Sequence, residues 1–299
     1  MIVPRKALQQ NTVASHYDDL DQFYRDIWGE HVHHGLWLTG RENPQQAVEQ
    51  LVVHVAQRAA VAQGDRVCDV GCGYGGTSRI LAHEYGAEVT ALTISPAQHK
   101  YASEKEPDQS NPVYLLRDWC ENQLPPASFD VVISIESSEH MPDKAAFFAE
   151  VSRVLRPGGR FVVCAWLARS GARAWEIDHL LEPICREGRL PGMGTAEEYH
   201  QFARDAGLNP TGFDDLSRQV KRTWPLCAWR MIKGLIREPA YRRFLFVEKS
   251  PDRIFALTVF RIWMAYRTGS MQYGILTALK PAEIEAGCSP VAYNALRGS

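Results

Sequence analysis

Short apolar runs alternate with amphipathic stretches through the central third of the chain. Each run is followed by a glycine or proline turn and then by apolar residues at helical spacing. The runs predict strands over 66–70, 88–94, 113–116, 129–135 and 160–166. The intervening stretches predict helices over 77–85, from residue 96, and over 144–155. Strands and helices alternating at this spacing predict an α/β fold with a doubly wound parallel sheet.

The flanking segments follow other patterns. Residues 1–15 are expected to be poorly ordered, and 29–40 predict a loop rich in histidine and glycine. Helical spacing is found over 15–28, 44–61, 175–186, 195–206, 224–236 and 254–266. Two further strand candidates are 212–216 and 272–279, and the last eighteen residues, from Ala282, predict a disordered tail.

Composition narrows the class of protein. The chain is 45% hydrophobic and 23% charged, as soluble globular proteins are, and its net charge of -2 argues against nucleic acid as a partner. Seven cysteines without CxxC spacing argue against a disulfide framework or structural zinc. The N-terminus has no signal-peptide apolar core, and no apolar run is long enough to span a membrane, so we expect a cytoplasmic protein.

A glycine turn after the first core strand carries the strongest chemical signal. Asp69 is followed by Gly71, Gly73 and Gly75, and then by a helix. Glycines let the backbone approach a ligand closely, and the helix N-terminus offers N–H groups to an anion. Because Gly76 also completes a GxGxxG pattern, spacing alone leaves a dinucleotide and another nucleoside cofactor both open.

The end of the second strand separates these cofactors. Dinucleotide enzymes place an acidic residue there to accept the ribose hydroxyls, whereas this chain has LTIS at 92–95. Glu88 lies too far back, at the start of the strand. NAD is therefore disfavoured.

The segment VCDVGCGYGGTSRILAHEYGAEVTALTISPAQ at 67–98 resembles motif I and its continuation in class I S-adenosylmethionine-dependent methyltransferases. Its TISPAQ ending resembles the corresponding segment in the branch that contains cyclopropane fatty acid synthases, coclaurine N-methyltransferases and tocopherol methyltransferases. Enzymes of that branch also lack the ribose carboxylate. DIWGEHVHHGLW at 26–37, SIESSEHMPDKAAF at 134–147 and YGILTALKP at 273–281 most resemble gamma-tocopherol C-methyltransferases.

This resemblance implies a Rossmann-like core, S-adenosyl-L-methionine as cofactor and a hydrophobic small-molecule acceptor methylated at a phenolic ring carbon. Alternatives are a natural-product N- or O-methyltransferase and a non-catalytic S-adenosylmethionine-binding module. The chain would then divide into an N-terminal helical segment that covers the cofactor (1–62), the core (63–170), a helical substrate lid (171–270), and a last strand with a tail (271–299). The acceptor and the oligomeric state are left open.

The resemblance also implies the cofactor contacts. Gly71, Cys72 and Gly73 would follow the methionine part, and Ile135 and Glu136 would border the sulfonium. The remaining implied contacts are Tyr17 and His33 or His34 from the N-terminal segment, Asp69, then Thr93, Ile94, Ser95 and Gln98 toward ribose and adenine, and Asp118 and Trp119 flanking adenine. From the residues alone, Asp118 could instead cap a helix and Trp119 could lie in the core.

Three titratable groups follow the fourth strand directly: Glu136, Glu139 and His140. Methylation of a phenol ring carbon requires removal of the phenol proton, and a group within hydrogen-bond reach can take it. His140 is the first candidate for this base and Glu139 the second, unless Glu139 only orients the His140 ring. Glu136 is a third possibility.

Two further features have competing interpretations. The histidines at 31, 33 and 34 lack a second cluster of metal ligands, so no metal site is expected. Aromatic residues fill 171–270 and predict a lid over an apolar acceptor, or the packing of that segment itself. Interleaved with them, Arg222, Arg230, Arg237, Arg242 and Arg243 predict either a solvated face or contacts of a peripheral protein with lipid head groups.

Overall fold

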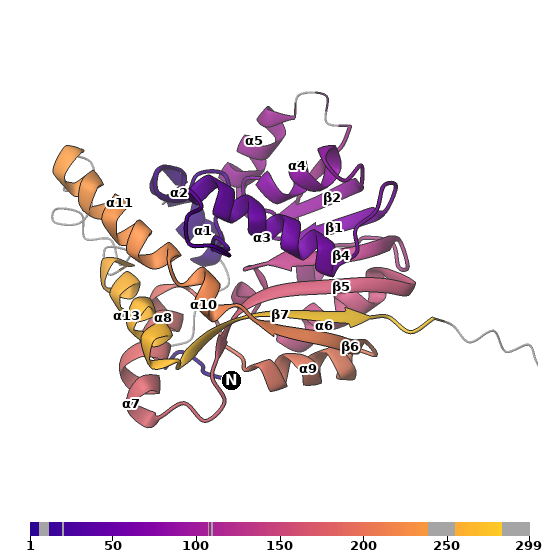
Figure 1. Cartoon of the computed structure of the whole chain (residues 1–299). Helices are drawn as coiled ribbons and strands as arrows, with labels where there is room; N and C mark the ends of the chain where they lie inside the picture. The colour runs from indigo at the N-terminus through magenta and orange to yellow at the C-terminus, as the bar shows by residue number, and fades with distance from the viewer. Residues whose placement is uncertain (6–11, 20, 107, 109, 239–254, 283–299) are drawn as a thin grey trace, which may run out of the picture.

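A seven-stranded sheet forms the centre of the molecule (Figure 1). The computed structural model describes residues 1–5, 12–19, 21–106, 108, 110–238 and 255–282. The strands are β1 (Arg66–Val70), β2 (Glu88–Thr93), β3 (Val113–Leu116), β4 (Phe129–Ile135), β5 (Leu155–Ala168), β6 (Asn209–Asp215) and β7 (Met271–Leu279). Their order is β3-β2-β1-β4-β5-β7-β6, with β1 to β5 parallel and β7 antiparallel to both neighbours. The predicted α/β sheet is confirmed.

Helices cover both faces of this sheet. They are α1 (Thr12–Asp19), α2 (Asp21–Trp28), α3 (Pro44–Arg58), α4 (Gly76–His83), α5 (Pro96–Lys105), α6 (Lys144–Val154), α7 (Ala174–Glu176), α8 (Glu182–Glu187), α9 (Ala196–Asp205), α10 (Ser217–Val220), α11 (Thr223–Arg237) and α13 (Phe255–Thr268). A π-helical turn, Ile177–Leu181, joins α7 to α8, and short 3-10 helices span Trp119–Glu121 and Ser138–His140.

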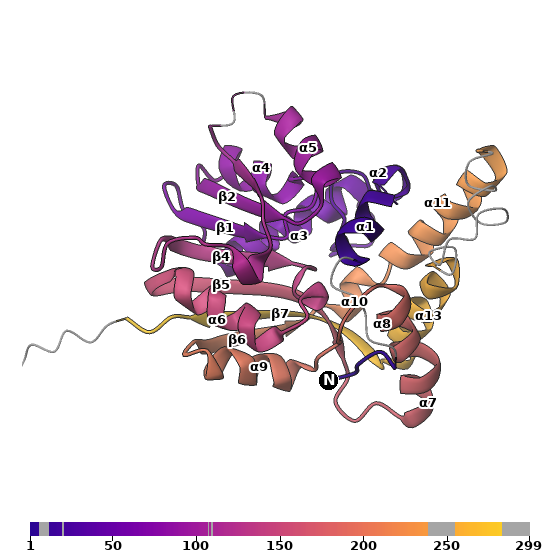
Figure 2. The same ribbon diagram turned by 180° about the vertical axis from the view of Figure 1, so that it is seen from behind.

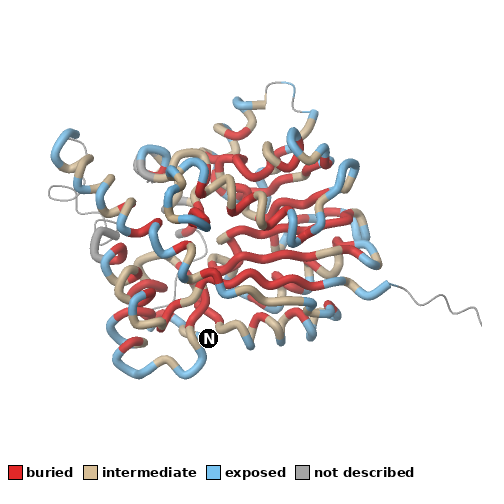
Figure 3. The backbone as a smooth tube through the Cα atoms, in the orientation of Figure 1, coloured by how far each residue is buried: buried red, intermediate tan, exposed pale blue. Residues whose placement is uncertain are grey.

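Side chains of alternate strand residues enter two separate apolar cores. Val131 and Ile133 pack in a core that includes residues of α3, α4, α11 and α13. Val132, between them, packs in a second core with residues of α6 and α9. Figure 3 shows the central strands β1 and β4 as almost continuously buried. A strand buried on both sides can be apolar throughout, which is why short apolar runs predicted these strands correctly.

The helices outside the central layers gather at one end of the sheet. Figures 1 and 2 show α1, α2, α11 and α13 beside that end, with α8 next to α13 and α7 below them. Trp224 of α11 and Ile262 of α13 belong to the same apolar core as α3 and α4. We call 174–187, 223–237 and 255–268 the cap.

Several predictions at the edges need correction. Residues 1–15 are not uniformly unstructured, because Ile2 pairs with the backbone of Met193 and α1 begins at Thr12. Residues 171–270 are not all lid, since α9 packs in the second core and β6 pairs with β7. The strand β5 starts before residue 160 because Leu155 already pairs with Phe129, ahead of a bulge. The predicted disordered tail from 283 onward, and the arginines 242 and 243, lie outside the described residues.

Among the described residues, no helix has the length and apolar character needed to cross a bilayer.

Candidate active site

The glycine turn after β1 opens onto a cavity of about 200 Å³ at the carboxyl end of the parallel strands. Gly71 and Gly73 have φ angles of +76° and +55°. A Cβ at Gly71 would lie 2.3 Å from the Cβ of Ser137, so this position is closely packed. A Cβ at Gly73 would meet no protein atom within 4 Å. The backbone at Gly73 therefore faces open space that a ligand can occupy.

Most of the predicted cofactor contacts line this cavity. They are Tyr17, Gly71, Gly73, Thr93, Ile94, Gln98, Asp118, Trp119, Ile135 and Glu136. Asp69, Cys72 and His33 instead line a small extension of about 30 Å³ that shares Gly71, Gly73 and Ile135 with the cavity. The structure thus brings together side chains from α1, β2, β4 and the glycine turn.

Other residues of the walls were not predicted. The cavity is also lined by Val13, Val32, Leu92, Arg117, Ser137, Met141, Pro142 and Pro191, and the extension by Glu30, His31 and Thr77. Of these, Arg117, Met141 and Pro142 lie next to predicted residues in the chain. Pro191 lies just beyond the α7–α8 segment, which sequence spacing could not place here.

The carboxyl end of β2 is organised by hydroxyl groups and by a carboxylate from α1. Thr93 Oγ1 donates to Gln98 Oε1 at 2.8 Å, and Ser95 Oγ accepts from the Gln98 N–H as the cap of α5. Ser95 Oγ donates to Asp18 Oδ1 at 2.6 Å, and Asp18 Oδ1 also accepts from the Ala97 N–H. Ser95 is thus fully buried behind the cavity, where its role is to hold α1 against α5.

Asp118 caps a helix and Trp119 lies in the core, the two roles that the sequence had left open beside contact with adenine. The Asp118 carboxylate accepts from the Cys120 N–H at 2.8 Å and caps a short 3-10 helix. Trp119 is 1% exposed, and its indole N–H donates to the Phe147 carbonyl at 3.2 Å. Both residues still contribute to the cavity wall.

Glu136 is a buried anchor between the strands and the histidine loop. Its Oε1 accepts from the His34 N–H and the Tyr273 hydroxyl, and its Oε2 accepts from His34 Nδ1 at 3.0 Å and Trp166 Nε1 at 2.7 Å. Burial alone would raise the pKa of Glu136, but His34 and these hydrogen bonds lower it to about 2. Glu136 is therefore a carboxylate whose lone pairs are engaged, and it is unsuited to act as the base.

His34 lies behind Glu136 and does not line the cavity, whereas the alternative cofactor contact, His33, lines its small extension. The Nδ1 of His34 faces Glu136, and its Nε2 accepts from Trp224 Nε1 at 2.8 Å. These partners fix the orientation of the His34 ring. The ring thereby joins the histidine loop to α11 of the cap.

His31 and His33 form a pair beside the glycine turn, with 3.1 Å between His31 Nδ1 and His33 Nε2. Burial lowers the pKa of His31 to about 3, with further lowering by His33 and Arg79, so its ring is neutral. Within the described ranges, no three His, Cys, Asp or Glu side chains come together as a metal site.

Asp69, at the base of the same extension, accepts from the Ser78 hydroxyl at 2.6 Å. Burial raises the pKa of Asp69 to about 6. Its hydrogen bond joins the end of β1 to α4 and so supports the glycine turn between them.

A second, smaller chamber of about 50 Å³ adjoins the cavity and extends under the cap. It shares Tyr17, Val32, Glu136 and His140 with the cavity wall. Its other walls are mainly apolar and aromatic: Tyr24, Trp28, Glu139, Trp166, Gly188, Leu190, Trp224, Thr258 and Ile262. Among the aromatic residues that line this chamber, Trp224 comes from the cap, Tyr24 and Trp28 come from α2, and Trp166 comes from β5.

His140 stands where the cavity and the chamber meet. Its Nε2 lies 3.0 Å from the hydroxyl of Tyr17, and its Nδ1 lies 3.4 Å from the carbonyl oxygen of Arg189. Both ring nitrogens are thus directed at groups other than Glu139, which contradicts the idea that Glu139 orients this ring. With a proton on Nδ1 toward Arg189, Nε2 accepts from Tyr17.

Glu139 is held inside the chamber wall by other donors. Its Oε1 accepts from the Trp166 N–H at 2.5 Å, and its Oε2 accepts from the Ser138 hydroxyl at 3.2 Å. Burial raises the pKa of Glu139 to about 7, the charge of Glu136 adds to this, and the Trp166 N–H opposes it. The buried ammonium of Lys144 donates to the backbone carbonyl of Glu139 at 3.0 Å.

The comparisons with known proteins agree with this geometry. Residues 68–163 match the methyltransferase domain family. The chain is 30% identical to the chloroplastic tocopherol O-methyltransferase of Arabidopsis thaliana, over 90% of this chain and 82% of that protein. It is 36% identical to the 2-methyl-6-phytyl-1,4-hydroquinone methyltransferase of Synechocystis, over 96% and 93%.

Among solved structures, the cyclopropane synthase MmaA2 of Mycobacterium tuberculosis superposes with a TM-score of 0.78 at 20% identity, over 92% of this chain and all of that one. This likeness concerns the fold. Together with the two relatives that match over most of their length, it establishes that the chain belongs to the S-adenosylmethionine-dependent methyltransferases.

Proposed function

We propose that this protein methylates a phenolic ring carbon of a hydrophobic acceptor. The observation that carries the proposal is that the cavity beside the glycine turn meets an apolar chamber at Tyr17 and His140. The names of the two relatives, a tocopherol and a phytyl-hydroquinone methyltransferase, support a phenolic acceptor.

The cavity residues fit S-adenosylmethionine. The open face at Gly73 offers room for the methionine part, and Thr93 and Gln98 offer polar groups for the ribose. S-Adenosylmethionine supplies an electrophilic methyl group on a positively charged sulfonium. Because its pKa is held low, Glu136 keeps a negative charge in the wall near the chamber, which favours a cation there.

In this proposal, the cap forms the acceptor side together with α2 and β5. Trp28, Trp166 and Trp224 form aromatic walls whose rings meet edge to face, with 5.5 Å between the centroids of Trp166 and Trp224. A cavity that accepts benzene has a volume of about 150 Å³. At about 50 Å³, the chamber must enlarge when an acceptor ring enters, so we assign acceptor binding to a movement of the cap.

Tyr17 and His140 are placed to remove the phenol proton. In this proposal the acceptor hydroxyl donates to the Tyr17 oxygen while the Tyr17 proton passes to His140 Nε2. Burial raises the pKa of Tyr17, and Glu139 and Glu136 add to this, so Tyr17 stays neutral and acts only as a relay. The electron density that returns to the ring makes the ortho carbon nucleophilic, and holding that carbon in line with the methyl group then favours transfer.

The experiment is a comparison of His140→Ala and Tyr17→Phe with His179→Ala, an exposed cap histidine, as the matched control. Turnover with a phenolic acceptor is measured beside cofactor affinity by calorimetry. We expect His140→Ala to lower kcat by about 10²–10⁴-fold with little change in cofactor affinity, the usual range for one general base. We expect Tyr17→Phe to lower kcat as well and His179→Ala to leave it unchanged. Full turnover by His140→Ala would refute the assignment of the base.

A further inference from the structure

Helix α11 has an unusual distribution of charge for a helix at the surface. It spans Thr223–Arg237 and contains Arg230, Lys233 and Arg237 but no acidic residue. Figures 1 and 2 show that it extends outward from the body of the molecule, beyond the end of the sheet. Only its first turns are anchored deeply, through buried Trp224 and Cys227.

Large apolar side chains are exposed along the outer part of this helix. Trp229 is 58% exposed, Ile232 53% and Ile236 72%. Their spacing of three and four residues places them in one stripe on the helix surface. Burial of such side chains is normally favourable, so a contiguous exposed stripe marks a surface that contacts something apolar.

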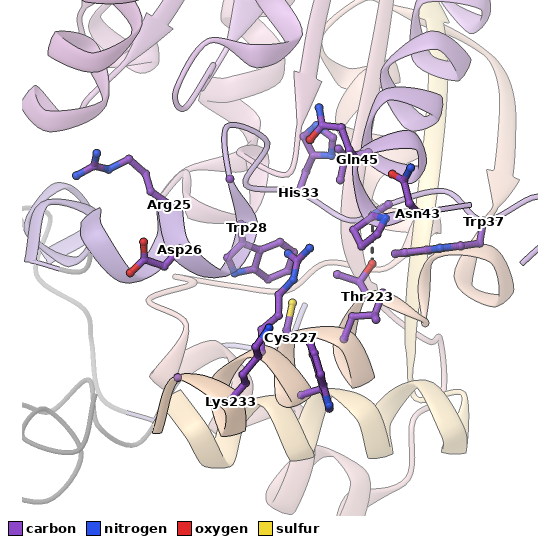
Figure 4. Close-up of a pocket in the computed structure, with 18 of the residues that line it drawn as sticks. Arg25, Asp26, Trp28, His33, Trp37, Asn43, Gln45, Thr223, Cys227 and Lys233 are labelled. Carbon is purple, nitrogen blue, oxygen red and sulfur yellow. Dashed lines mark hydrogen bonds between the residues drawn. The ribbon is translucent and has the colours of Figure 1, made fainter. Parts of the chain in front are cut away.

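The cations lie beside this stripe, along a groove of about 880 Å³ between α2, α3 and α11 (Figure 4). Arg230, Lys233 and Arg237 line the groove at intervals of three and four residues. The ammonium of Lys233 lies 5.0 Å from the ring centroid of Trp229, which couples the basic edge to the apolar stripe.

The groove as a whole is also cationic. Arg25 from α2 faces it in addition to the three basic residues of α11, whereas its carboxylates are Asp26 and Glu238. Arg25 is paired with Asp21 at 2.6 Å, whereas Arg230, Lys233 and Arg237 come from α11.

We propose that α11 docks this protein on an anionic membrane surface. Trp229, Ile232 and Ile236 enter the boundary between head groups and acyl chains, and the adjacent basic residues face lipid phosphates. An apolar stripe with Trp, edged by Lys and Arg and free of acidic residues, is the pattern of a helix that lies in the interface plane. Charge complementarity selects an anionic lipid surface over a neutral one.

This docking would place the acceptor chamber near the bilayer. Trp28 lines both the groove and the chamber, so the two spaces adjoin at this side chain. The docking itself does not depend on which acceptor is methylated, and its test requires no acceptor.

The test is sedimentation of the full chain with vesicles of phosphatidylcholine alone or mixed with phosphatidylglycerol. We expect binding to the mixed vesicles that weakens with salt. Replacement of Arg230, Lys233 and Arg237 by Gln should lower this affinity about 100-fold, and Trp229→Ser with Ile232→Ser at least about tenfold. The matched control is Val113→Ser with Leu116→Ser, two exposed apolar residues of β3, which should bind as the unaltered protein does.

Circular dichroism and cofactor affinity verify that each variant is folded, because none of the replaced residues lines the cofactor cavity or the chamber. Equal binding to both kinds of vesicle, or α11 variants that bind like the unaltered protein, would overturn the proposal. A dimer in solution that is lost in Trp229→Ser with Ile232→Ser would assign the stripe to a second copy of the chain and overturn it as well.

Discussion

Replacing Gly73 by alanine separates the role of this residue in binding from its role in folding. A residue with a Cβ loses about 1–2 kcal/mol in a left-handed conformation, and Gly73 has a φ of +55°. The added methyl group meets no protein atom within 4 Å, so no steric cost in the empty site adds to this. We expect the free energy of unfolding to fall by about 1–2 kcal/mol.

The affinity for the cofactor should fall for a separate reason. The methyl group projects into the space assigned to the cofactor, and overpacking by one such group costs about 1–3 kcal/mol. This corresponds to a loss of affinity of about 5- to 150-fold. The assay is calorimetric titration with S-adenosylhomocysteine, beside urea unfolding of the same samples.

Gly207→Ala is the matched control. Gly207 follows α9, its φ is +78°, and a Cβ there also meets no protein atom within 4 Å. It does not line the cavity. Both variants should lose similar stability, but only Gly73→Ala should lose affinity. Unchanged affinity in Gly73→Ala, or an equal loss in both variants, would refute the placement of the cofactor along the glycine turn.

Three further substitutions test the surroundings of the site. Glu136→Gln puts an amide N–H where a carboxylate oxygen accepts hydrogen bonds. It should lower the free energy of unfolding by about 1–3 kcal/mol in urea titrations, and no measurable loss would contradict the anchoring role. Folding raises the pKa of Glu139 from its ordinary 4.5 to about 7, so the free energy of unfolding should fall as pH rises from 4.5 through 7. In Glu139→Gln, measured by urea unfolding at each pH, this part of the fall should vanish. An unchanged pH dependence in the variant would assign it to other groups. Leu190→Ala removes a buried side chain from the chamber wall and should lower the free energy of unfolding by about 2–5 kcal/mol. The larger chamber should raise kcat/KM for bulkier acceptor rings relative to smaller ones, with cofactor affinity retained. An unaltered acceptor preference would exclude Leu190 from the acceptor site.

The central fold was predictable because its signals are local. Each core strand is an apolar run bounded by turn residues. Ser95 and Pro96 predicted the start of α5, and in the structure Ser95 caps this helix and Pro96 is its first residue. The glycine turn was equally local, since its conformations require glycine at fixed positions. Such features need no knowledge of distant parts of the chain.

Contacts between distant segments could not be predicted from the sequence. Asp18 reaches Ser95 across 77 positions, so the contact between α1 and the end of β2 could not be predicted from local spacing. The resemblance implied His33 or His34 as a cofactor contact, and nothing local showed that His34 pairs with Glu136, 102 positions away. The ring of His140 likewise depends on Tyr17 and Arg189 and not on the adjacent Glu139.

The most direct test of the proposed reaction is the fate of the transferred methyl group. The protein is incubated with S-adenosylmethionine that carries a ¹³C-labelled methyl group and with a phytyl-substituted hydroquinone, and the product is examined by NMR. We predict a labelled methyl group on a ring carbon ortho to a hydroxyl, formed by the unaltered protein and not by His140→Ala. A labelled methyl group on oxygen, or on the nitrogen of an amine acceptor offered in the same panel, would contradict the account.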